Sequence, residues 1–151
     1  MKILARHLIA DLFNCKNNTL LDIETAKETI QTVLSDLSLE VKTLASEKLD
    51  DEHYTILAVF ASGHLSLHIY PQLKYVALDT FICQEDADPE IISSAIRTFF
   101  KPDKTKTTVL KRGDFGIAKE LKPKIKTKVA PLRKIHNTGA KVIRILARRN
   151  R

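Results

Sequence analysis

Apolar and polar positions alternate along the middle of this chain, between Tyr54 and Cys83. Three runs rich in β-branched and aromatic residues, 55–61, 65–70 and 75–83, are separated only by short connections. A period of two over runs of this length is typical of β-strands, and connections this short are typical of hairpins. The segment therefore predicts three strands at the centre of a sheet.

The two faces of these strands differ in chemistry. Strand alternation places Leu65 and Leu67 on one face, and His64, Ser66 and His68 on the other. The polar side chains are thus presented together within an otherwise apolar segment. Such a concentration of polar groups requires an explanation beyond packing.

The flanking segments predict two helices and three more strands. Residues 22–37 carry apolar side chains at a period near 3.6 and contain neither Gly nor Pro, which predicts a helix. A second helix is predicted from Pro89 to about Phe100, with Asp88 as its N-cap. The remaining strands are predicted at 3–12, 39–45 and 105–112. This order predicts an α+β fold, a two-layer sandwich whose mainly antiparallel sheet carries helices on one face.

The positive charge is concentrated near the C-terminus. The whole chain has a formal net charge of +7, but residues 117–151 contain twelve Lys or Arg and a single acid, Glu120. The first 116 residues therefore sum to about −4, and the basic character does not belong to the folded part. We expect a domain at 1–116 and a basic tail at 117–151, an extended linker that could end in a short helix.

Several roles remain open for the tail. A solvated tail requires nothing further of the sequence. Clustered positive charge also supports sequence-independent contact with nucleic acid or with an acidic partner. Membrane-surface binding is least favoured, because the apolar face near the C-terminus is small: Val142, Ile143, Ile145 and Leu146.

The cysteines and the longest apolar runs indicate a compartment. No apolar run approaches 18 residues, so we expect no membrane span. Cys15 and Cys83 fit no zinc or redox spacing, and we expect no metal site. These features predict a cytoplasmic protein with reduced cysteines.

Three blocks of the sequence resemble a known family. ARHLIADLFNC at 5–15, SGHLSLHIYP at 62–71 and VALDTFIC at 76–83 resemble, in order and in spacing, the signatures of bacterial and archaeal S-adenosylmethionine decarboxylases. The resemblance covers about the first 115 residues. It implies a two-layer protomer that dimerises through its sheet, a role in spermidine (polyamine) biosynthesis, and a pyruvoyl cofactor made from the chain itself.

The residue that forms the cofactor is replaced in this chain. In the family a serine attacks the preceding peptide carbonyl and becomes the pyruvoyl group, and that serine aligns with Gly63. Glycine has no hydroxyl, so neither ester formation nor elimination can occur there. The resemblance then implies an unprocessed homologue without a cofactor. Its role would be binding or regulatory, as a homodimer or as a heterodimer with an active paralogue.

Two alternatives stay open at this point. The chain could be an active decarboxylase of S-adenosylmethionine or a related amino acid, with Ser62 cleaving after Ala61 and forming the pyruvoyl group. A one-residue shift along a strand reverses the side-chain direction, so this requires a turn or bulge before His64. The other alternative is a nucleic-acid-associated protein that binds through residues 117–151.

The resemblance also implies roles for other residues. His68 matches a histidine that assists self-cleavage, Cys83 matches a cysteine that returns a proton to the substrate, and Thr55 matches a serine that assists processing.

Three further positions match residues that hold S-adenosylmethionine in the family. Tyr70 matches an aromatic residue that stacks on adenine, and it can still stack. Gln72 replaces a carboxylate that binds the ribose hydroxyls, and Leu49 lies near the place of a second aromatic residue. A nucleoside would therefore be held from one side only.

Overall fold

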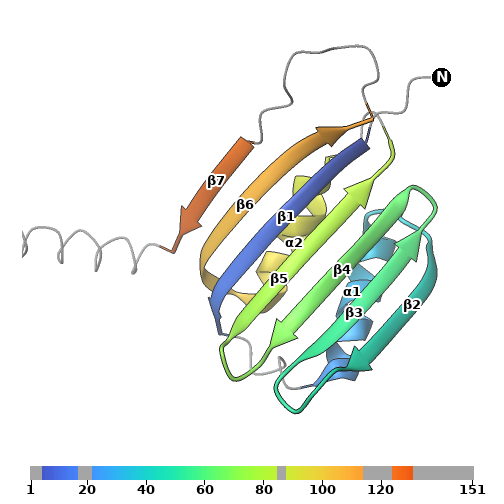
Figure 1. Ribbon diagram of the computed structural model, residues 1–151. Helices are drawn as coiled ribbons and strands as arrows, with labels where there is room; N and C mark the ends of the chain where they lie inside the picture. The colour runs from blue at the N-terminus through green and yellow to red at the C-terminus, as the bar shows by residue number, and fades with distance from the viewer. Residues whose placement is uncertain (1–4, 17–21, 85–87, 114–123, 131–151) are drawn as a thin grey trace, which may run out of the picture.

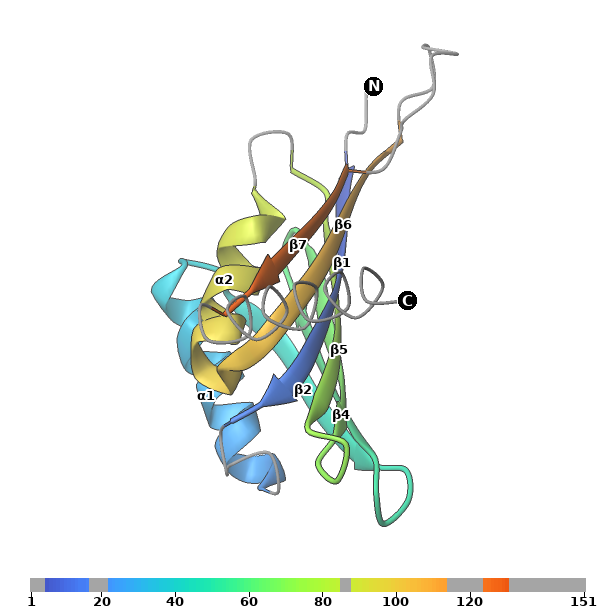
Figure 2. The ribbon, with the colours of Figure 1, turned by 90° about the vertical axis from the view of Figure 1, so that its left-hand side faces the viewer.

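The computed structural model describes residues 5–16, 22–84, 88–113 and 124–130. The described strands and helices are β1 (Ala5–Cys15), α1 (Ile23–Asp36), β2 (Val41–Lys48), β3 (Tyr54–Phe60), β4 (Gly63–Tyr70), β5 (Tyr75–Ile82), α2 (Pro89–Phe100), β6 (Pro102–Arg112) and β7 (Lys124–Val129). Neighbouring strands pair antiparallel in one sheet of order β2-β3-β4-β5-β1-β6-β7. Both helices pack on the same face (Figure 1; Figure 2). This confirms the α+β two-layer sandwich.

Both helices have an aspartate as N-cap: Asp88, as predicted, and Asp22, the first residue of the other predicted helix. The side chain of Asp22 accepts a hydrogen bond from the Glu24 N–H at 3.1 Å, and that of Asp88 accepts one from the Glu90 N–H at 2.9 Å. These bonds satisfy amide groups that have no partner inside the helix. No described helix is long and apolar enough to span a membrane.

The core lies between the helices and the sheet. Every second residue of β4 and β5 is buried against the helices, and β1 and β3 contribute from either side. The largest fully buried side chains are Phe100, Leu8, Leu12, Ile30, Leu34, Ile56, Leu65, Leu67, Ile69, Leu78, Ile92 and Ile96. Burial of each such side chain contributes about 2 kcal/mol. This layer fixes the direction of the remaining residues, which point to the other side of the sheet.

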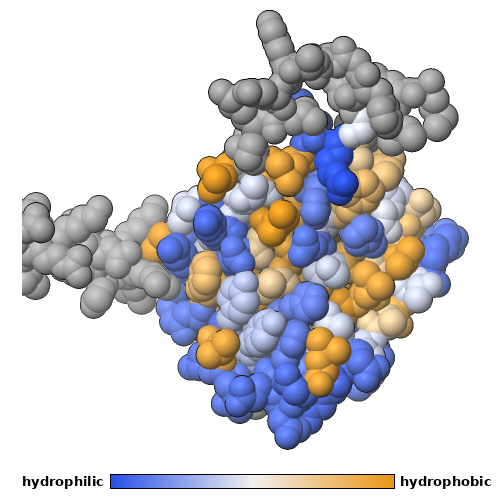
Figure 3. Space-filling view, viewed as in Figure 1, coloured by the Kyte–Doolittle hydropathy of each residue, from blue (hydrophilic) through white to orange (hydrophobic). Residues whose placement is uncertain are grey.

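We call that other side, which no described helix covers, the open face. It carries His64, Ser66 and His68, as strand alternation predicts. Exposed aliphatic side chains, among them Leu57 and Val59, lie between these polar groups. Apolar and polar patches therefore alternate over this surface (Figure 3).

The sheet continues past the boundary expected at residue 116. Residues 124–129 form β7 and pair with β6, with Val129 opposite Lys104. The Nζ of Lys126 lies 2.7 Å from Oε1 of Glu90 at the start of α2. Six residues of the basic segment thus belong to the sheet. The short helix expected near the C-terminus lies outside the described residues.

Candidate functional site

Ser62, Gly63 and Cys83 meet at one end of the sheet. Gly63 is the first residue of β4, and the ladder places it opposite Phe60 of β3 and Ile82 of β5. The N–H of Cys83 donates to the carbonyl oxygen of Ser62 at 2.7 Å. A nucleophile at position 63 would attack this carbonyl, which a backbone donor already polarises.

The backbone of β5 leaves no space for a side chain at position 63. A Cβ added to Gly63 would lie 1.8 Å from the carbonyl oxygen of Phe81 and 3.1 Å from the Cα of Ile82. Both are main-chain atoms, so the clash can be relieved only by moving a strand. Gly63 is thus required by the close approach of β5.

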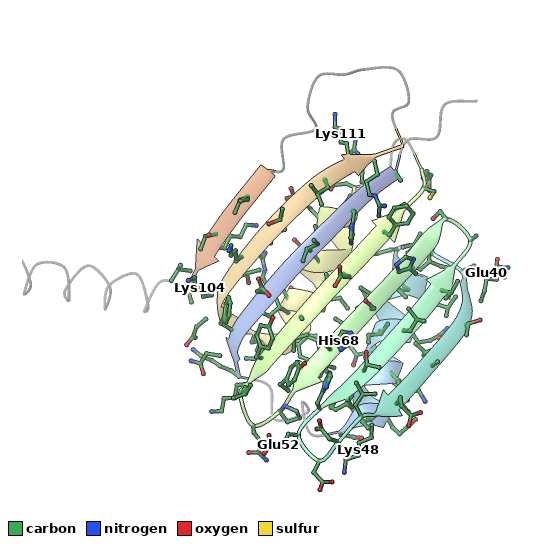
Figure 4. The ribbon with its side chains drawn as sticks, viewed as in Figure 1. Glu40, Lys48, Glu52, His68, Lys104 and Lys111 are labelled. Atoms are coloured by element: carbon green, nitrogen blue, oxygen red, sulfur yellow. The ribbon has the colours of Figure 1, made fainter. Side chains whose placement is uncertain are left out.

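Thr55 and His68 lie toward the opposite end of the sheet, where Figure 4 labels His68. They face each other across β3 and β4. The hydroxyl of Thr55 donates to the carbonyl oxygen of Leu67 at 2.8 Å. Gly63 and His68 are five positions apart along β4, which is roughly 17 Å at the rise of a strand. One protomer therefore does not bring these groups together.

His53 was not predicted as a site residue, yet it contacts two residues that were. Its Nε2 lies 3.0 Å from Nδ1 of His68. Its ring stacks on Tyr70 with centroids 4.1 Å apart and an angle of 12° between the planes. The register pairs Tyr54 with Ile69, so the preceding residue, His53, comes beside Tyr70. Alternation extended two residues before the predicted strand puts His53 on the face of Thr55 and would have found it.

The stack continues across the sheet as an aromatic row, which comprises His53, Tyr70, Tyr75 and Phe13. The rings of Tyr70 and Tyr75 are 5.7 Å apart, and those of Tyr75 and Phe13 are 5.5 Å apart. The hydroxyl of Tyr75 donates to Oδ1 of Asp11 at 2.6 Å. Burial raises the pKa of Tyr75, and the bond to Asp11 raises it further, so the phenol stays protonated at neutral pH. The row is therefore a polar-edged aromatic surface.

Leu49 and Gln72 lie at the His53 end of this row. The N–H of Leu49 donates to the carbonyl oxygen of His53 at 2.9 Å, and the side chain of Leu49 is 52% exposed. Gln72, in the turn after β4, lines a recess of about 240 Å³ together with Ile23, Lys48, Asp50, Asp51, Glu52, His53, Tyr54 and Pro71. Because residue 49 is leucine, it provides no aromatic ring against which a base could stack.

Among the described residues, no group of three or more His, Cys, Asp or Glu is arranged to hold a metal ion.

The two cysteines differ in accessibility, which predicts selective alkylation. Cys83 is exposed and Cys15 is buried. Burial, followed by the nearby carboxylate of Asp103, raises the pKa of Cys15 to about 12. Because the thiolate is the nucleophile, iodoacetamide at about pH 8 is expected to modify Cys83 alone in the native protein. Mass spectrometry should show one adduct, and none for Cys83→Ser; two adducts on the native chain would contradict this.

The arrangement defines a class of protein, a two-layer α+β sandwich in which one antiparallel sheet carries both helices on a single face. A solved structure of this class, the adenosylmethionine decarboxylase from Aquifex aeolicus, aligns with a TM-score of 0.66 at 19% identity, over 80% of this chain and 98% of that one. A monomeric Trypanosoma brucei decarboxylase (AdoMetDC) aligns with a TM-score of 0.53 at 16% identity, over 70% and 45%. At these identities the likeness shows the fold.

Sequence comparison identifies the family within that class. The family model for S-adenosylmethionine decarboxylase matches residues 6–113. The S-adenosylmethionine decarboxylase proenzyme of Methanococcus vannielii is 32% identical over 121 residues, which cover 80% of this chain and 99% of the relative. That of Caldicellulosiruptor saccharolyticus is 31% identical over 115 residues, which cover 76% and 93%. The chain belongs to the S-adenosylmethionine decarboxylase family, which confirms the resemblance carried by the three sequence blocks.

The family resemblance implies a pyruvoyl group at position 63, and this position does not fit one. Gly63 lacks the hydroxyl, and the carbonyl of Phe81 fills the space that a side chain would need. The carbonyl of Ser62 nevertheless accepts a hydrogen bond from the N–H of Cys83. Position 63 therefore departs from the family both in its residue and in its contact with β5.

Proposed function

We propose that this chain is an S-adenosylmethionine decarboxylase homologue that remains unprocessed and acts as a binding or regulatory subunit. The observation that carries the proposal is the contact between position 63 and Phe81, which excludes a Cβ as well as a hydroxyl. Without that hydroxyl no ester forms at position 63, and the chain stays intact. Its role in polyamine biosynthesis is then to bind a ligand or a partner chain.

The separation of the site residues supports a two-fold dimer through the open face. Gly63 and His68 lie roughly 17 Å apart in one protomer. A two-fold axis that lies between two packed sheets and runs across the strands brings the Gly63 end of one protomer over the His68 end of its partner. Three exposed aliphatic side chains of this face supply apolar contact area: Ile9, Leu57 and Val59. Each dimer then contains two composite sites.

This geometry gives the chain a role beside an active paralogue. In such a heterodimer, the paralogue contributes the processed end of one composite site. This chain contributes Thr55 and His68 to the same site. The second composite site has Gly63 at its reactive position and can only bind a ligand. A homodimer has two sites of that second kind.

One feature favours processing at Ser62 as the second candidate. Ala61 and Ser62 form the turn between β3 and β4, so the side chain of Ser62 is not fixed by strand alternation. Attack by its hydroxyl on the Ala61 carbonyl would give fragments of 61 and 90 residues.

The intact mass of the purified chain under denaturing conditions distinguishes the two candidates. We expect one species near 17.1 kDa. Fragments of 61 and 90 residues, the longer with a ketone-bearing blocked N-terminus, would contradict the unprocessed state. Ser62→Ala is the matched variant, because it leaves the first result unchanged and abolishes the second.

The basic segment supports a separate candidate, contact with nucleic acid through residues 117–151. Because residues 124–129 pair with β6, deletion from residue 117 would remove a strand and expose a sheet edge. Deletion from residue 131 removes charge without that effect. Salt-dependent binding of nucleic acid that is lost in the second deletion would support this candidate.

A further inference from the structure

One face of the Tyr70 ring is already covered in this structure. The imidazole of His53 lies nearly parallel to it, at 12°, with a centroid separation of 4.1 Å. A planar base stacked on the same face would need the position of the imidazole. The two arrangements exclude each other.

A hydrogen bond to His68 holds the imidazole there, and this bond is lost when both rings are charged. His53 Nε2 and His68 Nδ1 are 3.0 Å apart, so one nitrogen donates a proton and the other accepts it. The pair tolerates at most three protons on its four ring nitrogens. A fourth proton removes the acceptor and places two like charges about 3 Å apart, where they repel strongly. Charging both rings therefore breaks the bond.

The main chain of His53 is fixed, so opening requires only a rotation of its side chain. The carbonyl oxygen of His53 accepts hydrogen bonds from the N–H groups of Leu49 and Asp50, at 2.9 and 3.2 Å. These bonds hold the connection between β2 and β3 in place. The imidazole can leave Tyr70 without a change in the sheet.

Charged side chains surround the pair, and Lys48, which lines the same recess as His53, lies 2.9 Å from Oδ1 of Asp51. On the open face, one row across the sheet reads Glu47, Thr55, His68, Ala77 and Asp11. The two carboxylates lie two strands from His68, roughly 10 Å away on either side. Asp50, Asp51 and Glu52 precede His53 in the connection, and the phenol of Tyr75 is held by Asp11. No described cation lies in this row between the two carboxylates.

We propose that His53 is a specificity residue that occupies the position of a ligand's planar base on Tyr70, and that charging the His53–His68 pair releases it. The ligand half of this inference rests on the proposed binding function. The site then accepts an adenine-type ring only after His53 has rotated away. While His53 is stacked on Tyr70, the site favours ligands that do not stack on this face of Tyr70.

Proton NMR of the imidazole rings tests the release of His53 from Tyr70 without a ligand. At about pH 8 the ring protons of His53 are expected upfield, over the ring of Tyr70. They should lose this shift in Tyr70→Leu and, in the unmodified chain, on titration to about pH 5. His64 is the internal control, because its ring stacks on Phe81 and not on Tyr70, with centroids 5.6 Å apart. An upfield shift of His53 that persists at pH 5 would overturn the proposal.

Calorimetric titration with S-adenosylmethionine at about pH 7.5 tests the specificity. His53→Ala is expected to bind S-adenosylmethionine about three- to tenfold more tightly than the unmodified chain. Adding Tyr70→Ala to His53→Ala should abolish this gain. His64→Ala should leave the affinity unchanged. Equal affinity of His53→Ala and the unmodified chain would refute the specificity role. If no variant binds, the proposed ligand function fails, and the NMR titration still shows whether His53 leaves Tyr70 when the pair is charged.

Discussion

A serine introduced at position 63 is expected to destabilise the protein and to leave the chain uncleaved. In Gly63→Ser the new Cβ would lie 1.8 Å from the carbonyl oxygen of Phe81, so β4 and β5 must separate locally. Overpacking of this kind costs about 3 kcal/mol of unfolding free energy when main-chain atoms must move. Denaturant unfolding measures the loss, and mass spectrometry under denaturing conditions detects cleavage.

Two variants separate the clash from the hydroxyl. Ala61→Ser adds only a hydroxyl, in the exposed turn, and is expected to change the unfolding free energy by less than about 0.5 kcal/mol. Gly63→Ala adds the Cβ alone and should cost as much as Gly63→Ser. Native-like stability of Gly63→Ser, or its cleavage at the bond between positions 62 and 63, would show that only an oxygen is missing.

An acidic residue in the middle of the open face is expected to dissociate the proposed dimer. Leu57 is 39% exposed at the centre of β3 and would be covered by the partner. Leu57→Asp places two like charges in one desolvated interface, because the two-fold axis applies each substitution twice. We expect a dissociation constant at least about 100-fold higher, equivalent to roughly 2.7 kcal/mol. Light scattering with size-exclusion chromatography measures the change from dimer to monomer.

The matched control lies on the other surface of the molecule. Ile91 of α2 is 53% exposed, and the helix layer separates it from the open face. Ile91→Asp should remain dimeric with an unchanged dissociation constant. A dimer that survives Leu57→Asp but not Ile91→Asp would place the interface on the helices, and a monomeric unmodified chain would contradict the dimer altogether.

Most of the fold could be predicted because its signals are local. The alternation at 55–83 and the apolar period at 22–37 each reflect which side of one element is buried. Asp22 and Asp88 mark both helix starts through bonds to residues two positions later. The strand β7 was not predicted, because Lys residues and flanking prolines at 123 and 131 suggested a linker. Its Lys-Ile-Lys-Thr-Lys-Val alternation is nevertheless typical of an edge strand protected by lysines.

The candidate site was predictable only where a sequence motif marks it. The missing hydroxyl at Gly63 is visible in the sequence, but the missing space there depends on the approach of β5, which sequence spacing does not report. His53 lies in a polar connection and gains its significance from two rings on another strand. Contacts between strands, rather than residue types, determine both features.

The register of β7 also fixes the place from which the remaining basic residues depart. The N–H of Ala130 donates to the carbonyl oxygen of Asp103 at 2.6 Å, and Val129 lies opposite Lys104, which is itself opposite Phe13. The last 21 residues are therefore tethered roughly 10 Å from one end of the aromatic row. A phosphate-bearing ring bound on those aromatics would therefore lie near the point where a basic segment leaves the sheet.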